Sequence, residues 1–464
     1  MTFSRYIQAA FDERWILYTL FALSLIAHTA VFGTLLFHYG PQGFFLSQGG
    51  VLDGNDGQHY VILAKNIVEG NGYSRFVDAP FEPDALRTPL LPSYFVPFFF
   101  VGGLQLLWCA MLFLNIVLAF APLVLYKLAR LFLSHGYAVG AALVLILNPL
   151  FLYRSQLAEP DALFVFLLIL AAYFAGLFWK NATPRYFFIS SFILGLSILL
   201  KPTGLYVAVI MFACHAAYIV FYRRGEWRTR FLHLIFGAAI ILAILSPWLI
   251  RNNVVFGGWG ISSVGGFNLY EFYTVNQKMP NEQVPEEIMV SSREPSRYLP
   301  NQAYFTSVAI DRIREAPLSY AKEQIVGSVR NLFVSELPVI YYYGHVKLLP
   351  FSYNPESETN LRELVLVGDG AAAFFALIHN IPKVLWFAAL SLLYLLAFAG
   401  WLYAWKDRST FISFTFFLLL FSYFVVASGP YVDAKYRMPA MPLIIVIALY
   451  GMHELRGVWK RTGV

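Results

Sequence analysis

The chain has 464 residues, of which 59% are hydrophobic and 18% aromatic, while only 13% are charged. In soluble globular domains roughly a quarter of all residues are charged. The low charged fraction here therefore excludes an ordinary soluble fold and predicts a polytopic membrane protein. The formal net charge is +6, but the basic residues stand in short connections between apolar runs, which the positive-inside rule explains better than nucleic-acid binding does. Cys109 and Cys214 each lie inside an apolar run, so we expect neither a disulfide framework nor a metal site from them.

Long apolar runs recur along most of the chain. Crossing the roughly 30 Å hydrocarbon core of a bilayer takes about 20 apolar residues in a helix, and several runs reach that length. The first run ends in FHYGPQG, without a small-residue cleavage site, so we expect an uncleaved anchor. The pattern predicts an all-α polytopic membrane protein with about ten transmembrane helices. The predicted spans are 15–37, 104–126, 137–152, 160–179, 186–200, 204–222, 231–250, 381–405, 410–428 and 439–455.

The basic residues outside these runs are distributed unevenly between the two sides that alternating spans create. Most of them fall on one side, which the positive-inside rule identifies as cytoplasmic. The short connections on the other side contain only Arg154, Lys201, Lys435 and Arg437. We therefore expect both termini to be cytoplasmic.

This topology places two long segments, 38–103 and 251–380, on the outer side of the membrane. We expect an N-terminal membrane module at 1–250, whose first external loop (38–103) is partly helical. A small external subdomain at 251–380 is then followed by three membrane helices within 381–464.

Acidic, amide and basic side chains gather at 51–92, soon after the first span. Asp53, Asp56 and His59 are spaced three residues apart there. Asp56 could cap a short helix that the apolar spacing from Tyr60 onward predicts, or it could take part in chemistry. With Asp53 and His59 it could also hold a divalent metal. Spacing alone leaves these alternatives open.

Several segments in this order resemble a known group of enzymes. The first loop contains Asp56 and Tyr60 as Asp-x-x-x-Tyr, then LAKNIVEGNGYS and ALRTPLLPSY. SQLAEPDALFVF, LGLSILLKPTGL, SPWLIRNNVVFGGWGISSVGGFN and DAKYRMPAMPLI follow. Together they resemble bacterial membrane glycosyltransferases of the GT-C superfamily, in particular glycosyltransferase family 39 and the aminoarabinose-transferase-like group, which includes protein O-mannosyltransferases. The resemblance covers about 50–270 and 430–455; Gly57 departs from it, because some members have Glu there.

The resemblance implies a GT-C-type fold and an inverting glycosyltransferase. A sugar would move from a polyprenyl-phosphate carrier to a lipid, glycan or protein of the cell envelope, on the outer face of the bacterial inner membrane. The leaving group is a phosphate monoester, whose second pKa is about 6, so it departs as an anion without a general acid. One carboxylate then suffices as base, and we expect Asp56 in this role, with Asp53 as the second choice.

The carrier phosphate requires cations close to the membrane surface. Arg87, Lys201, Arg251 and Arg437 stand at external ends of predicted spans and are expected to bind it, although snorkelling to the interface would explain the same placement. Glu159, Asp161 and Tyr60 are expected to orient the acceptor or the base. No cofactor is required, and a divalent metal at Asp53, Asp56 and His59 stays an alternative.

Two other functions are compatible with this pattern. One is a transporter or flippase of lipid-linked sugars, which would place ionisable residues near the membrane midplane. The other is an oligosaccharide polymerase or ligase, which would use Arg or His residues of 251–380. The predicted spans are nearly free of charge, which favours chemistry at one face of the membrane. The expected partners are the lipid-linked donor, the acceptor and membrane lipid, with no nucleic acid.

Overall fold

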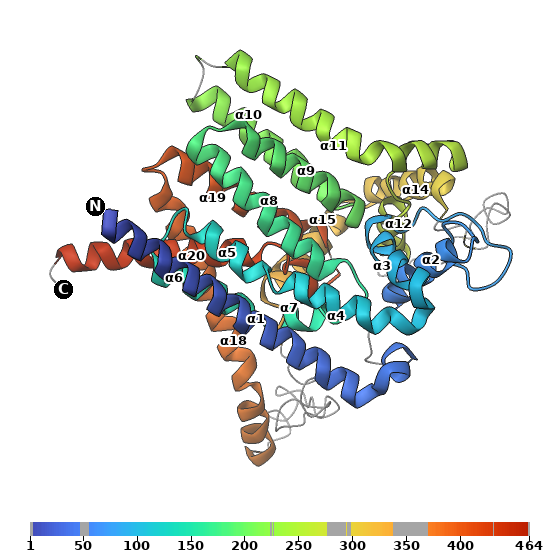
Figure 1. The fold of residues 1–464 in the computed structure, drawn as a ribbon, viewed down its shortest axis with the longest axis horizontal. Helices are drawn as coiled ribbons and strands as arrows, with labels where there is room; N and C mark the ends of the chain where they lie inside the picture. Colours follow the sequence, from blue (N-terminus) through green and yellow to red (C-terminus); the bar gives the residue numbers. More distant parts are fainter. Residues whose placement is uncertain are drawn as a thin grey trace.

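The computed structural model describes residues 3–46, 55–222, 225, 227–275, 294, 298–336, 370–429 and 431–462. Within these residues every regular element is a helix (Figure 1). The N-terminal elements are α1 (Phe3–Leu46), α2 (Asn55–Val68), α3 (Leu90–Gly102), η1 (Gly103–Leu106), α4 (Leu107–Leu118), α5 (Ala121–Ala129), α6 (His135–Ile146), α7 (Pro149–Arg154) and α8 (Asp161–Asn181). The remaining elements are α9 (Pro184–Leu200), α10 (Gly204–Tyr222), α11 (Trp227–Phe256), α12 (Val264–Val275), η4 (Leu299–Asn301), α14 (Gln302–Glu315), α15 (Pro317–Phe333), α18 (Gly370–Ala404), α19 (Arg408–Ala427), η6 (Ala434–Tyr436) and α20 (Met441–Thr462).

The predicted all-α membrane architecture is confirmed, and most predicted spans coincide with one helix. The predicted span 104–126 instead covers η1, α4 and part of α5, and 137–152 covers parts of α6 and α7. Among the described residues, eight helical stretches are long and apolar enough to cross a bilayer. Two further predicted spans correspond to the shorter apolar helices α6 and α9. The eight stretches are Glu13–Pro41, Leu90–Ala129, Asp161–Asn181, Gly204–Tyr222, Trp227–Phe256, Ile381–Ala404, Arg408–Ala427 and Met441–Trp459.

Helix α3 is an apolar element that the sequence analysis assigned to the external loop. It packs against α2 and buries Leu91, Phe95 and Phe99. Its prolines lower its helix propensity, and its apolar run continues directly into the predicted span at 104–126. Gly103, with φ 63°, turns the chain between α3 and α4, because a left-handed conformation costs glycine little.

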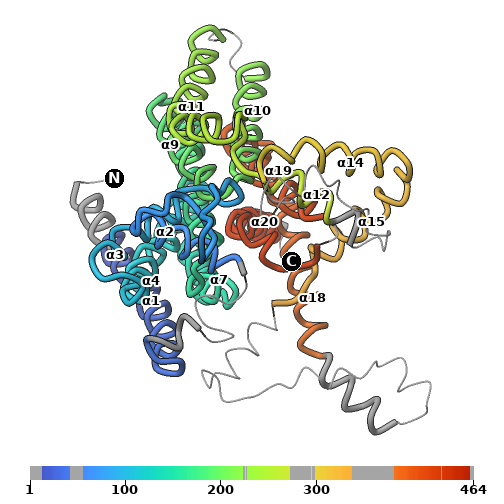
Figure 2. The backbone as a smooth tube through the Cα atoms, turned by 90° about the vertical axis from the view of Figure 1, so that its right-hand side faces the viewer, coloured from blue at the N-terminus to red at the C-terminus, as the bar shows by residue number. Residues whose placement is uncertain are grey.

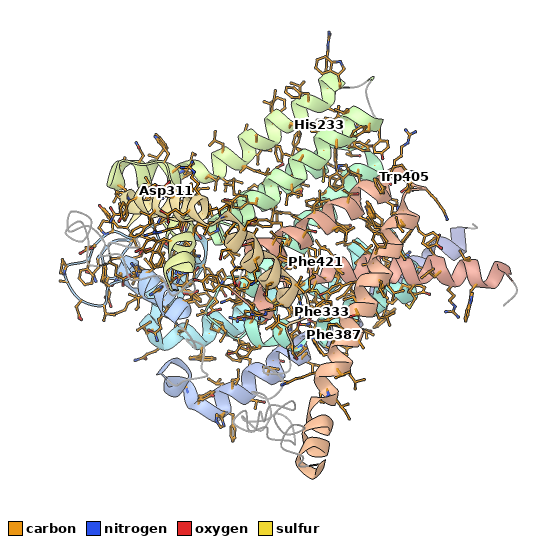
Figure 3. All side chains as sticks on the ribbon, turned by 180° about the vertical axis from the view of Figure 1, so that it is seen from behind. His233, Asp311, Phe333, Phe387, Trp405 and Phe421 are labelled. Carbon is orange, nitrogen blue, oxygen red and sulfur yellow. The ribbon has the colours of Figure 1, made fainter. Side chains whose placement is uncertain are left out.

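The centre of the helical bundle is α8, which packs against α5, α9 and α19. Its interior side chains include Phe164, Phe178 and Trp179, none of them more than 1% exposed. The helices that bear on function lie around this core: α11 packs on α9, and α18 packs on α20. Aromatic contacts join the described part of 251–380 to the bundle, since the rings of Phe333 and Phe387 lie 4.5 Å apart (Figure 3).

The two ends of the bundle differ in what they carry. The chain termini lie together at one end, whereas α2, α3, α12 and α14 lie at the other (Figure 1). Figure 2 looks onto that second end, with α2 and α14 on the side facing the viewer. The connections that hold most of the predicted site residues meet at this second end.

Candidate active site

Two glycines shape the first loop of the candidate site. Gly70 and Gly72 have φ values of 80° and 77°, a backbone conformation that favours glycine. The turn lets the Asn66 side chain donate to two backbone carbonyls of the loop, at 2.7 and 2.9 Å. The loop thereby folds back along α2 and returns Arg87 to the start of that helix.

The backbone around Arg87 is held from several directions. Its N–H donates to the Asp84 carboxylate at 3.1 Å, and its carbonyl accepts from the Tyr73 hydroxyl at 3.1 Å. The neighbouring Thr88 hydroxyl donates to the carbonyl of Leu200 at 2.9 Å. Arg87 is therefore placed by contacts to its own loop and to the end of α9.

The Arg87 guanidinium brings the polar residues of the first loop together. It forms an ion pair with Asp56, donates to His59 Nδ1 at 3.3 Å through Nε, and lies 5.4 Å from the centroid of the Tyr60 ring. Because Arg has no acceptor, Nδ1 of His59 must accept in this contact. The Asp56 side chain is 52% exposed and the Arg87 side chain 13%. Asp56 is thus an accessible carboxylate at the start of α2, where the helix dipole favours a negative charge.

The second loop contributes two carboxyl groups, each paired with a cation. Arg154, at the end of α7, donates to Glu159 at 2.8 Å. Asp161, in the first turn of α8, lies 2.5 Å from Lys201 Nζ. Both carboxyl side chains are only 8% exposed. Each has a cationic partner, because an unpaired charge next to a membrane span is costly. Lys201 is therefore engaged by an acid that the sequence analysis placed in the same site.

The connection before α20 supplies residues that the sequence analysis did not assign. The Asp433 side chain caps η6 by accepting from the Lys435 N–H at 2.8 Å, and it lies 3.6 Å from Arg154. Lys435 Nζ lies 4.0 Å from Asp433, and its side chain is 29% exposed. It is a loosely paired cation beside the two buried carboxyl groups. The sequence signal for Lys435 was its place in DAKYR, a connection that is predicted to be external and that carries part of the family resemblance.

Electrostatic coupling shows that these loops form one cluster. Burial raises the pKa of the Glu159 carboxyl to about 7, and Asp161 adds to that increase. Arg154 and Lys435 oppose it, while Asp56 of the first loop raises it further. Acids and cations from three separate connections therefore act on one another at the same end of the bundle.

Arg251, which is predicted to bind the carrier phosphate, contacts the first loop and α11 in this structure. Its guanidinium donates to the carbonyl of Asp84 at 2.7 Å. It also lies 4.9 Å from the ring centroid of Trp248 and 5.3 Å from that of Tyr73. Arg251 thus ties the first loop to α11.

Arg437 is likewise enclosed. Its side chain is 0% exposed, donates to the carbonyl of Asn331 at 2.9 Å and pairs with Glu336 at 3.3 Å. Burial raises the pKa of the Glu336 carboxyl, against the effect of Arg437. The guanidinium joins the connection before α20 to α15 and to the segment that follows it.

The predicted metal set is only partly described. Asp53 lies outside the described residues, and Asp56 and His59 both contact Arg87. Within the described part of the chain, no group of three or more His, Cys, Asp or Glu side chains is arranged to hold a metal ion.

One known family matches part of the chain. Residues 87–250 match the family described as dolichyl-phosphate-mannose-protein mannosyltransferase. Over these residues, about a third of the chain, the protein is similar to this mannosyltransferase family. The matched region begins at Arg87 and includes Glu159, Asp161 and Lys201, while Asp56 precedes it. The prediction of a glycosyltransferase of the lipid-phosphate-sugar class is thereby confirmed at the level of the family. No curated protein matches the chain in sequence.

Solved structures confirm the GT-C-type fold. The archaeal oligosaccharyltransferase AglB from Archaeoglobus fulgidus, in complex with an inhibitory peptide and a dolichol-phosphate, is 17% identical with a TM-score of 0.50; the match covers 98% of this chain and 52% of AglB. The Archaeoglobus fulgidus oligosaccharyltransferase in complex with Zn and sulfate is 16% identical with a TM-score of 0.51, covering 96% of this chain and 49% of the other. This chain spans about half the length of these oligosaccharyltransferases. At such identities the likeness concerns the fold alone.

Proposed function

We propose that this protein is an inverting membrane glycosyltransferase that moves a sugar from a polyprenyl-phosphate carrier to a hydroxyl acceptor, with Asp56 as the base. The observation that carries the proposal is the half-exposed Asp56 carboxylate, held by Arg87 within a cluster of paired charges at one end of a mannosyltransferase-family fold. An exposed carboxylate can reach a substrate, whereas Glu159 and Asp161 are buried against their partners.

The reaction requires one proton transfer and one displacement. The acceptor oxygen forms a bond to the anomeric carbon as its proton passes to the Asp56 carboxylate. The bond between that carbon and the phosphate oxygen breaks, and its electron pair leaves with the phosphate. Because attack and departure take place on opposite faces of the sugar, the configuration inverts. The leaving phosphate is already stable as an anion, so it needs a cation and no acid.

The cations best placed for the donor phosphate are Lys435, Arg87 and Lys201. Among the described residues, Lys435 pairs with Asp433 at 4.0 Å, so an incoming phosphate competes with a weak ion pair. Arg87 and Lys201 are held by Asp56 and Asp161, and could shift toward a phosphate. Arg251 and Arg437 instead stabilise the loops that carry the site.

Glu159 and Asp161 are proposed to orient the acceptor and to balance the charge around Asp56. Tyr60 is only 4% exposed and lies against Arg87, so its role would be to position that guanidinium. The acceptor would be a lipid, glycan or protein of the bacterial cell envelope, and the site would face outward from the inner membrane. The concentration of basic residues at the opposite end of the bundle supports this orientation.

The test is transfer in vitro from a synthetic polyprenyl-phosphate sugar. We expect Asp56→Asn to reduce the rate by about 10² to 10⁴, the usual contribution of a general base, with an unchanged unfolding temperature. Glu69→Gln is the matched control, because Glu69 is an exposed acid at the other end of α2; this variant should retain full activity.

Transfer by Asp56→Asn at the wild-type rate would overturn the proposed base. If an exposed residue of 251–380 were then essential, for example Arg330 tested as Arg330→Gln, the polymerase or ligase alternative would gain support. A protein that moves lipid-linked sugar between leaflets without transferring it to any acceptor would instead be a flippase.

A further inference from the structure

A groove with no part in the proposed reaction lies between α9 and α11. It has a volume of about 660 Å³, and its lining includes Pro184 and Phe188 on α9 and Thr229, Phe236 and Ala243 on α11. Both helices run from this end toward the candidate active site, α9 ending next to Lys201 and α11 containing Arg251. The groove therefore lies at the opposite end of the bundle from that site.

The wall of the groove is apolar and faces outward. Phe236 on α11 is 54% exposed, as is expected of a side chain that meets lipid. From Thr229 to Ala243 the groove follows α11 for about 21 Å at 1.5 Å per residue. One leaflet contributes about half of a 30 Å hydrocarbon core, so the groove is long enough for an acyl chain and part of a headgroup.

A buried polar group lines this groove. His233 is 6% exposed, and its Nδ1 has no hydrogen-bond partner among the described residues. Its ring packs edge-on against Phe178 and Phe188, at centroid distances of 5.7 and 6.0 Å. Figure 3 labels it on α11. A buried ring nitrogen without a hydrogen-bond partner is costly to the folded protein.

Positive charge gathers where the groove begins. α9 starts at Pro184 and α11 at Trp227, and helix starts favour phosphate groups through their free N–H groups. The N-cap residue of α9, Thr183, provides no side-chain hydrogen bond to them. Arg185 and Arg228 follow these two starts; both are exposed, and neither pairs with a described carboxylate.

We propose that this groove binds an anionic phospholipid. One acyl chain would lie along α11, and the headgroup phosphate would lie at the starts of α9 and α11, close to Arg185 and Arg228. Charge complementarity selects this occupant over a polyprenyl tail, because a tail carries no phosphate at this face when its own phosphate lies in the active site. The groove is distinct from the donor site, and only the exclusion of a polyprenyl tail rests on the proposed function.

The proposal is tested by lipid retention in native mass spectrometry. Protein is extracted from nanodiscs of equal parts phosphatidylglycerol and phosphatidylcholine, and the bound lipids are counted. We expect the wild type to retain phosphatidylglycerol preferentially. Arg185→Gln and Arg228→Gln should each weaken this preference about fivefold, the effect of one basic residue near an anionic headgroup. Arg456→Gln removes an exposed arginine from α20 and should leave the preference unchanged.

A second pair of variants separates the groove from general surface charge. Ala239→Trp fills the groove, since Ala239 lines it, and should abolish retention of the preferred lipid. Ala238→Trp adds the same side chain at an exposed position of α11 that does not line the groove and should retain the lipid. Equal retention of both lipids by the wild type, or equal behaviour of these two variants, would overturn the proposal.

Discussion

At the scale of single residues, the site consists of acidic and basic side chains that form ion pairs between loops. Arg87 engages Asp56 and His59 of the first loop, Arg154 reaches both Glu159 and Asp433, and Lys201 engages Asp161. Such pairing compensates the cost of keeping charge beside an apolar bundle. It also presets the positions of the groups that would meet the substrate.

Glu159 makes the stability of the protein depend on pH. Burial raises the pKa of its carboxyl from 4.5 to about 7 in the folded protein. Between these values the unfolded chain releases a proton that the folded protein keeps, so the free energy of unfolding falls as pH rises. As the pH rises from 4.5 to about 7, the free energy of unfolding of wild type should fall by up to about 3 kcal/mol relative to that of Glu159→Gln. Unfolding in detergent at several pH values measures this difference.

The control for this experiment is Glu69→Gln, which changes an exposed carboxyl with 45% side-chain exposure. Its unfolding curve should follow that of wild type at every pH. If the free energy of unfolding of wild type and of Glu159→Gln changed with pH in the same way, the pKa of the Glu159 carboxyl would be the same in the folded and the unfolded protein.

Lys435 is expected to contribute to donor binding. Loss of a charge-assisted contact to the carrier phosphate should raise the KM for the donor roughly tenfold in Lys435→Met, with a smaller effect on kcat. Lys435→Arg should recover much of the affinity. Steady-state kinetics with a synthetic donor measure both constants, and Lys65→Met, which removes a partly exposed lysine of α2, is the control. If the KM for the donor were unchanged in Lys435→Met, other cations than Lys435 would bind the donor phosphate.

At the scale of elements, the site depends on how loops are fastened to helices. The first loop is tied to α11 through Arg251 and to the segment after α11, where the Ser262 hydroxyl donates to the carbonyl of Leu86 at 2.7 Å. The connection that carries Lys435 leads directly into α20. Changes in the packing of α20 should therefore reach the site.

Glycines allow α18 and α20 to pack closely. A Cβ atom on Gly400 would collide with the carbonyl oxygen of Ile447, and one on Gly451 with that of Leu396. Small residues at helix contacts are typical of membrane bundles. We expect Gly400→Ala to destabilise the protein by about 1–3 kcal/mol through overpacking, as a lower unfolding temperature, and to reduce transfer.

The matched control is Gly457→Ala, because a Cβ atom there meets nothing within 4 Å. This variant should be neutral or slightly stabilising, since alanine has the higher helix propensity. If both variants unfolded at the same temperature as wild type, the close approach of α18 and α20 would not limit stability.

At the scale of the whole molecule, the polar loops of the site and the termini occupy opposite ends of the bundle. The charge distribution predicts that the termini are cytoplasmic. In a protein with Cys109→Ala and Cys214→Ala, we expect Gln58→Cys to react with a membrane-impermeant maleimide added to intact spheroplasts. Gly225→Cys, exposed at the other end, should react only after permeabilisation. Labelling of both cysteines from the same side would contradict this topology.

The spans could be located from sequence because lipid imposes a simple requirement. A helix that crosses the bilayer needs about 20 apolar residues to satisfy its backbone internally, and that demand is visible in composition. Helix α3 was missed because it is a short apolar run with prolines that merges with the following span. The family resemblance also followed from the order of short motifs, and the match at 87–250 agrees with it.

The pairing of charges depended on the tertiary structure. Arg87 and Asp56 are 31 residues apart, and Lys201 and Asp161 are 40 apart. Arg437 is enclosed by Glu336, which is 101 residues away. An arginine at the end of an apolar run has the same local pattern whether it binds a phosphate, snorkels or pairs with a buried acid. Only the packing of distant loops decides which partner reaches it, because ion pairing depends on distance in space and on burial, neither of which spacing along the chain specifies.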